Sequence, residues 1–154
     1  MNNPIVWIDC EMTGLDTAVD ELVEVAVVVT DSDLRPADEG IDVLIRPSQA
    51  AVAHMNEFVR TMHTNSGLIE EWENLDLQEA AARVLAYIVR HVREPGKAPL
   101  GGNSICTDKA FLERYMPEVI GHLHYRVVDV SSLKELAKRW YPRTYFASPK
   151  KTGN

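Results

Sequence analysis

The sequence predicts an α/β fold in which a mixed five-stranded sheet is flanked by helices. Two observations support this prediction. Three strand-like segments, residues 4–10, 21–33 and 41–47, follow one another through short connectors, which favours an antiparallel arrangement of these first three strands. The remaining sequence alternates between helical and strand patterns, with two further strands at 98–104 and 125–130. Such alternation is typical of a layered α/β sheet.

Each strand is predicted from its residue types. PIVWIDC, 4–10, and ELVEVAVVVTDSD, 21–33, are rich in branched apolar side chains, and the Asp and Ser that end the second segment favour a strand over a helix. IDVLIRP, 41–47, ends at a proline. APLGGNS, 98–104, is a short apolar segment that runs into a Gly-Gly turn, and YRVVDV, 125–130, is the last strand.

Helices are predicted after the third, the fourth and the fifth strand. Residues 51–73 contain short helical pieces interrupted at 63–67. Residues 75–92 carry apolar side chains at helical spacing, and Asp76 is a good N-cap for that helix. The later helices are expected to begin at Thr107 or Asp108 and at residue 131, and to end at about Tyr115 and at residue 140.

The C-terminal part of the chain combines a helix with an irregular segment. Ser131 or Ser132 is the predicted N-cap of the helix at 131–140, with Glu135 following in a capping-box position. The last fourteen residues, YPRTYFASPKKTGN, contain turn formers without periodicity and are predicted to form a loop. Because no repeat or interdomain linker interrupts the sequence, we expect residues 1–154 to form a single domain.

Bulk composition favours a cytoplasmic globular protein. The chain is 45% hydrophobic, which is enough for a core, yet it contains no run of 18 apolar residues that could span a membrane. The N-terminus has neither the basic nor the long apolar region of a secretion signal. Its two cysteines, Cys10 and Cys106, are far apart and form no metal-binding or redox pattern, so a reduced cytoplasmic setting is expected.

The charges are unevenly distributed. Residues 1–80 contain 17 acidic and 3 basic side chains, whereas residues 130–154 contain six basic side chains and only Glu135 as an acid. The net charge of −7 argues against a protein that coats long nucleic acids. An acidic site that faces a basic segment suits a metal-dependent enzyme acting on a small phosphorylated ligand, and a solvated helix face with a basic tail is the simpler alternative.

Three acidic residues are candidate metal ligands. Asp9 and Glu11 lie two residues apart at the end of the first strand, so their side chains should project from the same face. Paired carboxylates of this kind bind a cation or raise one another's pKa, and oxygen ligands select Mg²⁺ or Mn²⁺. Asp108 lies in the first turn of a helix, where a carboxylate also has a local role beside the helix dipole. A solvated turn is the alternative for Asp9 and Glu11.

Three longer segments resemble one known family. WIDCEMTGL near the N-terminus, GNSICTD near residue 105 and HYRVVDVSSLKELAKRWYP after it are similar to the oligoribonucleases, and SGL at 66–68 extends the resemblance, which covers essentially the whole chain. These are 3′-to-5′ exonucleases of the DEDD superfamily, DEDDh type, with an RNase H-like fold. The resemblance implies a homodimeric enzyme that degrades RNA dinucleotides and very short oligoribonucleotides to 5′-mononucleotides, with two Mg²⁺ or Mn²⁺ ions.

The resemblance also implies a role for each acid. Asp9 would bridge the two ions, Glu11 would complete the shell of the first, and Asp108 would support the second, partly through water. The third motif of the family is a His followed five residues later by an Asp on a C-terminal helix. It is expected directly after residues 153–154 and is absent from the sequence. We therefore expect the C-terminal helix to be missing and this chain to be impaired or inactive.

Several residues are expected to hold the substrate. By resemblance, Leu15 is a wedge between the two terminal bases and Phe58 lies where relatives carry an aromatic that stacks on a base, which is worth about 1–3 kcal/mol. The alternative for both is an ordinary core position. Asn103 and Ser104 could bind phosphate or sugar, and His63 could contact the same end of the substrate or be an ordinary surface histidine.

The HYR segment implies a phosphate cap shared between two subunits. By resemblance, Tyr125 and Arg126 reach across a homodimer to the 5′ phosphate, and Ser131 joins them. Capping explains a preference for dinucleotides, and the planar guanidinium pairs well with phosphate oxygens. A strand-edge charge is the alternative for Arg126. Asp129 precedes a helix and is interpreted as an N-cap or a structural acceptor outside the metal site.

Two alternative functions remain open at this point. The chain could be an inactive nucleotide-binding or structural remnant, because its third motif is absent. It could also be a proofreading exonuclease directed at DNA. Leu15, Phe58 and the HYR segment argue against the second alternative.

Overall fold

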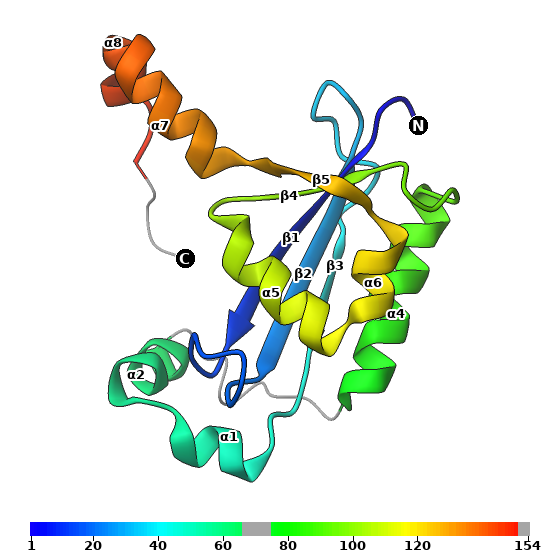
Figure 1. The fold of residues 1–154 in the computed structure, drawn as a ribbon, viewed down its shortest axis with the longest axis vertical. Coiled ribbons are helices and arrows are strands. Elements are labelled where there is room, and N and C mark those ends of the chain that lie inside the picture. Colours follow the sequence, from blue (N-terminus) through cyan, green and yellow to red (C-terminus); the bar gives the residue numbers. More distant parts are fainter. Residues whose placement is uncertain (66–74, 151–154) are drawn as a thin grey trace.

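The computed structural model describes residues 1–65 and 75–150 and contains one five-stranded mixed sheet (Figure 1). The strand order is β3-β2-β1-β4-β5. β1 pairs antiparallel with β2, and β2 with β3, whereas β4 lies parallel to both β1 and β5. This confirms the predicted mixed sheet with three antiparallel strands. The strands are β1 (Ile5–Met12), β2 (Leu22–Thr30), β3 (Ile41–Leu44), β4 (Pro99–Gly102) and β5 (His124–Asp129).

Helices cover one face of this sheet and extend beyond it (Figure 1). α4, α5 and α6 pack over the sheet, α1 and α2 lie near the end toward which β1 points, and α7 and α8 project away from the body. Within the described ranges, no helix is long and apolar enough to cross a membrane. The helices are α1 (Gln49–His54), α2 (Glu57–Asn65), α4 (Leu77–His91), α5 (Ile105–Tyr115), α6 (Pro117–His122), α7 (Val130–Trp140) and α8 (Pro142–Ala147).

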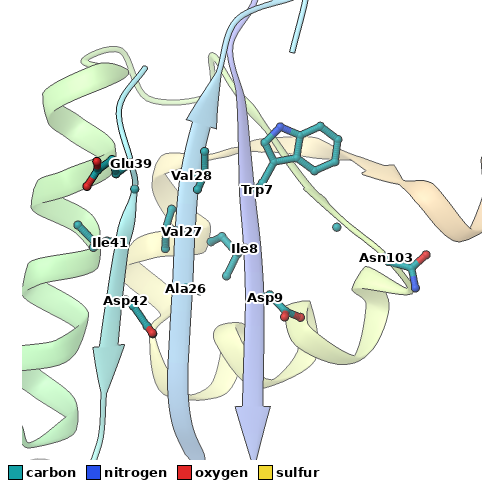
Figure 2. A pocket seen from close by; sticks show the side chains of 12 residues that line it. Trp7, Ile8, Asp9, Ala26, Val27, Val28, Glu39, Ile41, Asp42 and Asn103 are labelled. Atoms are coloured by element: carbon teal, nitrogen blue, oxygen red, sulfur yellow. The ribbon is translucent and has the colours of Figure 1, made fainter. Parts of the chain in front are cut away.

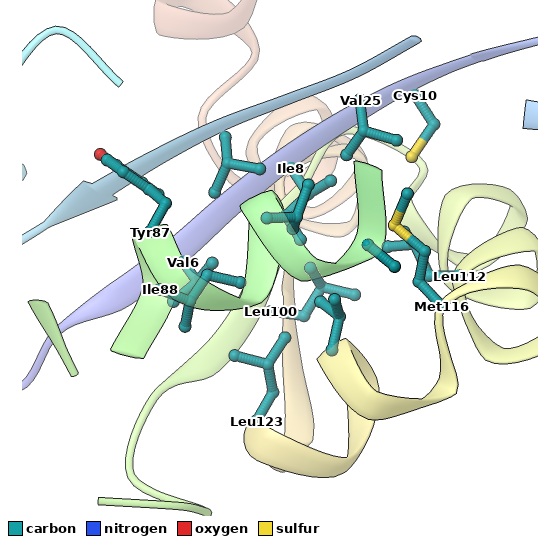
Figure 3. Packing of buried hydrophobic residues seen from close by; sticks show 14 of the residues in the cluster. Val6, Ile8, Cys10, Val25, Tyr87, Ile88, Leu100, Leu112, Met116 and Leu123 are labelled. Carbon is teal, nitrogen blue, oxygen red and sulfur yellow. The ribbon is translucent and has the colours of Figure 1, made fainter. Parts of the chain in front are cut away.

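The core lies between the sheet and helices α4, α5 and α6 (Figure 3). In β1, the side chains of Val6, Ile8 and Cys10 are buried and point to this core, because successive residues of a strand face opposite sides. Burial and the nearby carboxylate of Asp108 raise the pKa of the Cys10 thiol well above its usual value. Cys10 is thus a packing thiol on the face of β1 opposite Asp9 and Glu11.

Two helix starts differ from the prediction. α5 begins at Ile105, before the predicted Thr107 or Asp108, because Ser104 adopts a left-handed conformation (φ 55°) and turns the chain early. α7 is capped by Asp129 rather than by a serine, since Asp129 Oδ1 accepts hydrogen bonds from Ser131 N (2.9 Å) and Ser131 Oγ (2.7 Å). The interpretation of Asp129 as an N-cap is therefore confirmed.

Two short helices were absent from the prediction. α6 follows α5 directly, and α8 occupies part of the C-terminal segment that was predicted to be a loop. Each has only six residues and begins with a proline, Pro117 and Pro142. Proline suits the first helical position because its fixed φ matches the helix and its missing N–H would have no partner there. Six residues are too few for a helical periodicity of apolar residues to be visible.

Asp38 fastens the segment before β3 to the end of α4. Its Oδ1 accepts hydrogen bonds from the Tyr87 hydroxyl (2.7 Å) and from Gly40 N (2.9 Å). Its Oδ2 lies 2.6 Å from Arg90 Nη2 and 2.9 Å from His91 Nε2. The Tyr87 hydrogen bond, with the Gly40 amide and His91, lowers the pKa of Asp38 from 3.8 to about 2.

Replacement of Asp38 by Asn should lower the midpoint of thermal unfolding near neutral pH. A lowered pKa means that the ionised carboxyl stabilises the fold above about pH 3.8 and that this contribution is lost as the pH falls through about 2. Thermal unfolding followed by circular dichroism across this range should show a weaker acid dependence in Asp38→Asn. Asp33→Asn, whose side chain is 67% exposed, is the matched control and should resemble the natural chain.

Candidate active site

Acidic side chains from three strands lie on the open face of the sheet. Asp9 is exposed and Glu11 is half-buried, and both project from the face opposite the core. In the strand register, Glu11 lies opposite Glu24, and Asp9 lies opposite Ala26, which in turn lies opposite Asp42. The predicted common face of Asp9 and Glu11 is therefore confirmed.

Asp108 reaches this part of β1 from helix α5. Its Oδ1 accepts a hydrogen bond from the backbone N–H of Cys10 at 3.0 Å, and the residue is 8% exposed. β4 pairs with β1 only at Val6 and Trp7, so the edge of β1 is open where the carboxylate binds. Burial, and then the charge of Asp9, raise the pKa of Asp108. The three acids singled out in the sequence thus surround one segment of β1.

Glu24 and Asp42 are two acids of this face that sequence reasoning missed. Burial and a hydrogen bond with Asp42 raise the pKa of Glu24 from 4.5 to about 7, and the charges of Glu11 and Asp9 contribute further. Alternation within ELVEV could have placed Glu24 on one face of its strand. Its position opposite Glu11 depends on the register between the strands, which the sequence does not display.

A groove runs along the open face beside these acids (Figure 2). It has a volume of about 690 Å³ and combines an apolar floor with acidic and amide groups. Asp9 and Asn103 lie on one side of the groove and Asp42 on the other, as the labelled side chains show. The groove thus leads along the sheet to the acids. Its floor includes Trp7, Ala26 and Val28.

The donor chemistry at this position fits a hard divalent cation. Asp9 and Glu11 offer carboxylate oxygens on one face, which are the ligands that Mg²⁺ and Mn²⁺ prefer. A bound cation would also offset the charge of Asp9, which after burial contributes to the raised pKa of Asp108. Among residues 1–65 and 75–150, no three Asp, Glu, His or Cys side chains form a ready-made group of metal ligands. Asp9 and Glu11 are therefore the residues that would hold a cation, with Asp108 beside them.

Leu15 stands out from the surface just after β1. Its side chain is 78% exposed, so the alternative of a core position is wrong for this residue. The turn that carries it begins at Thr13, directly after the end of β1. A large apolar side chain is thus presented to solvent close to Glu11 in the sequence.

His63 lies against the end of β1. It is 1% exposed, and its Nε2 lies 2.7 Å from the carbonyl oxygen of Met12. The alternative of an ordinary surface histidine is therefore wrong, and a direct contact with substrate would require this ring to become accessible. Phe58 belongs to the same helix, α2, but its side chain lies outside the described residues, as does the SGL segment at 66–68.

The turn after β4 and the start of α7 meet at Asp129. Ser104 N donates a hydrogen bond to Asp129 Oδ1 at 2.9 Å, and Ser131 donates to the same oxygen from both its N–H and its hydroxyl. These hydrogen bonds, led by the Ser131 hydroxyl, lower the pKa of Asp129. Asn103 and Ser104 are exposed. The structure therefore brings three predicted substrate residues, Asn103, Ser104 and Ser131, to one place.

Tyr125 and Arg126 lie on β5, at the edge of the sheet. Both are exposed, and the Arg126 guanidinium carbon lies 5.5 Å from the centre of the Tyr125 ring. Because β4 separates β5 from β1, these side chains occupy a different strand position from the acids of the same chain. This placement leaves both residues accessible to a second molecule.

Comparison with known proteins establishes the family. A protein-family model described as an exonuclease (RNase_T) matches residues 6–152. An oligoribonuclease of Streptomyces griseus is 60% identical over 155 residues, which cover 100% of this chain and 77% of the relative. The chain belongs to the oligoribonuclease family. A second oligoribonuclease, from Leifsonia xyli, is 57% identical over 150 residues, covering 97% of this chain and 72% of the relative.

Solved structures confirm the exonuclease, RNase H-like fold expected of an oligoribonuclease. Exonuclease I from Methylocaldum szegediense matches with a TM-score of 0.68 at 16% identity, over 90% of this chain and 30% of that chain. Escherichia coli exonuclease I in complex with a dT13 oligonucleotide matches with a TM-score of 0.66 at 14% identity, over 92% of this chain and 31% of that chain. At these identities the likeness concerns the fold.

Replacement of Glu24 by Gln is expected to remove a pH dependence of stability. Because the pKa of Glu24 is raised from 4.5 to about 7 in the folded chain, its carboxyl stabilises the fold fully below pH 4.5, and this contribution is lost as the pH rises through about 7. The free energy of unfolding, measured in urea with a chelator present, should therefore fall less steeply with pH in Glu24→Gln. Glu118→Gln, on the exposed side of α6, is the control. Parallel curves for Glu24→Gln and the natural chain would refute the assignment.

Proposed function

We propose that this chain is a 3′-to-5′ exoribonuclease that hydrolyses RNA dinucleotides and very short oligoribonucleotides to 5′-mononucleotides with two Mg²⁺ or Mn²⁺ ions. One observation carries the proposal. In a chain of the oligoribonuclease family, the Cys10–Asp108 hydrogen bond brings Asp108 to the segment of β1 that carries Asp9 and Glu11. Three carboxylates at one strand suit phosphodiester hydrolysis better than any other chemistry that these side chains offer.

Each of the three acids would contribute to cation binding. Asp9 and Glu11 would bind on the open face, and Asp108 would support the second ion from the edge of β1. When bound, such ions activate a water molecule and stabilise the leaving oxygen. A structural neighbour, E. coli exonuclease I, has been solved as a zinc-bound complex with single-stranded DNA, which supports the proposal. We expect turnover to depend also on the His and Asp of the family's third motif.

The substrate would lie between the acids and two apolar side chains. Leu15, exposed beside the end of β1, would separate the two bases, and Phe58 would stack on one of them. Asn103 and Ser104, exposed in the turn after β4, would bind phosphate or sugar. His63 would act at the same end of the substrate by holding Met12, which precedes the Leu15 turn.

The proposed phosphate cap would explain a preference for short substrates. Tyr125, Arg126 and Ser131 would close the 5′ end of a dinucleotide, with Tyr125 and Arg126 contributed by the second subunit of a homodimer. The guanidinium of Arg126 matches the geometry of phosphate oxygens. The net charge of −7 also argues against a long RNA-binding surface. The natural setting of such an enzyme, with Cys10 and Cys106 both free, is the cytoplasm.

Loss of Glu11 should abolish hydrolysis. Glu11→Gln removes one carboxylate charge from the cation site while keeping its size, and we expect a loss of about 100-fold or more in the rate of cleavage of a 5′-labelled RNA dinucleotide with Mn²⁺. The assay is run on residues 1–154 and on a form extended through the third motif. Glu118→Gln is the control. Activity in neither unsubstituted form would contradict the enzyme proposal, and an unaffected Glu11→Gln variant would contradict the metal assignment.

If the phosphate cap is shared between two subunits, two different defective variants should restore activity when they are mixed. Arg126→Ala should weaken binding of a 5′-phosphorylated dinucleotide by about 10- to 100-fold, since charge-assisted hydrogen bonds are lost, while Arg83→Ala on α4 should have no effect. Mixing Arg126→Ala with Glu11→Gln subunits of the extended form should restore activity, because one site of the mixed dimer then has both groups intact. Mixtures that stay inactive, despite sedimentation showing mixed dimers, would place Arg126 in its own subunit's site.

A further inference from the structure

The turn that carries Leu15 is built around a buried carboxylate. Asp20 is 6% exposed, and its Oδ1 accepts a hydrogen bond from the Thr13 hydroxyl at 3.1 Å. Its Oδ2 accepts a second from the backbone N–H of Asp16 at 2.9 Å. The Thr13 hydroxyl in turn accepts a hydrogen bond from Glu21 N at 3.0 Å. We call this arrangement of Thr13, Asp16, Asp20 and Glu21 the turn clamp.

Gly14 makes room for this carboxylate. A Cβ atom at Gly14 would lie 2.3 Å from Asp20 Oδ2, so no larger residue fits without displacing Asp20. The carboxylate therefore packs directly against the backbone at Gly14 and binds the chain on both sides of Leu15. The Leu15 side chain then points outward, 78% exposed. A buried carboxylate is costly unless it is hydrogen-bonded, and here its hydrogen bonds hold the residues on either side of an exposed leucine.

The turn clamp is attached to the elements that carry the acids. The Tyr115 hydroxyl donates a hydrogen bond to the carbonyl oxygen of Asp20, and Arg114 Nη2 donates to the carbonyl of Ala18 at 3.4 Å. Tyr115 is the last residue of α5, the helix whose first turn carries Asp108. The position of the Leu15 turn relative to Asp108 is therefore fixed through a single rigid helix.

We propose that Thr13 and Asp20 are positioning residues that hold Leu15 ready to insert between the two bases of the substrate. This inference rests on the proposed function, which gives Leu15 its role. A side chain already held in its bound position loses less conformational freedom on binding, so the turn clamp raises the affinity for a dinucleotide. A mononucleotide has no second base to separate, so its affinity is independent of the clamp.

Thr13→Val tests the turn clamp with a change of nearly equal volume. It removes the donor to Asp20 and the acceptor for Glu21 N, and should weaken binding of a non-hydrolysable RNA dinucleotide by about 3- to 10-fold. Affinity for a 5′-mononucleotide should be unchanged. Thr13→Ser should restore dinucleotide binding, and Thr17→Val, in the same turn but outside the clamp, is the control. Equal losses for dinucleotide and mononucleotide would overturn the proposal in favour of a purely structural role.

A double-mutant cycle decides whether the clamp acts through Leu15. If it does, Thr13→Val should cause no further loss of dinucleotide affinity once Leu15→Ala has removed the side chain that the clamp positions. Additive losses in the double variant would overturn the proposal.

A measurement without ligand separates this inference from the proposed function. In the natural chain, the Asp16 and Glu21 amides should exchange slowly with solvent, and Thr13→Val should speed both and alter the NMR signals of the Leu15 methyl groups. Failure of the natural chain to bind any dinucleotide would overturn the proposed function and, with it, the role of Leu15. Dinucleotide binding together with unchanged exchange and unchanged Leu15 signals in Thr13→Val would overturn the turn clamp alone.

Discussion

The hydrogen bond from Cys10 N to Asp108 Oδ1 joins the two halves of the candidate site. It connects β1 to α5 across 98 residues of sequence. It forms because β4 pairs with β1 over only two residues, Val6 and Trp7, and leaves the rest of that edge unpaired. A backbone N–H at a buried edge needs a partner, and the carboxylate of Asp108 supplies it. The same helix then fixes the Leu15 turn through Tyr115.

Repulsion between carboxylates is the second constraint on this site. Asp9, Glu11, Glu24 and Asp42 project from three adjacent strands onto one face. Carboxylates crowded in this way must share protons or bind cations to lower their repulsion. Burial first, and then the neighbouring acids, raise the pKa of Glu24 and of Asp108. The same repulsion would favour binding of a divalent ion.

Local patterns in the sequence predicted those features that depend on one element alone. The period of a strand placed Asp9 and Glu11 on one face, and the cap at Asp76 located the start of α4. Features that depend on contacts between distant segments were not predictable in this way. The hydrogen bond between the side chains of Glu24 and Asp42 depends on how β2 and β3 pair, and the hydrogen bond from Ser104 N to Asp129 joins residues 25 positions apart.

The burial and orientation of two polar side chains near the candidate site were also not predictable from the sequence. The burial of His63 depends on how α2 packs beneath the end of β1, because its contact with Met12 joins residues 51 positions apart. The turn clamp involves only neighbouring residues, yet the TGLDTAVDE sequence does not show that Asp20 points inward rather than to solvent. Polar residues in a turn are expected outside, so only the structure distinguishes a structural carboxylate from a solvated one.

The central position of β1 in the sheet determines how the candidate site would unfold. β1 is paired with β2 along its whole length and is joined to α5 by a buried hydrogen bond. Backbone amides in such a strand exchange with solvent only when much of the domain opens. The Asp9 and Glu11 backbone should therefore stay ordered until the domain unfolds as a whole. The exposed arm of α7 and α8, which has no buried residue, can open without disturbing them.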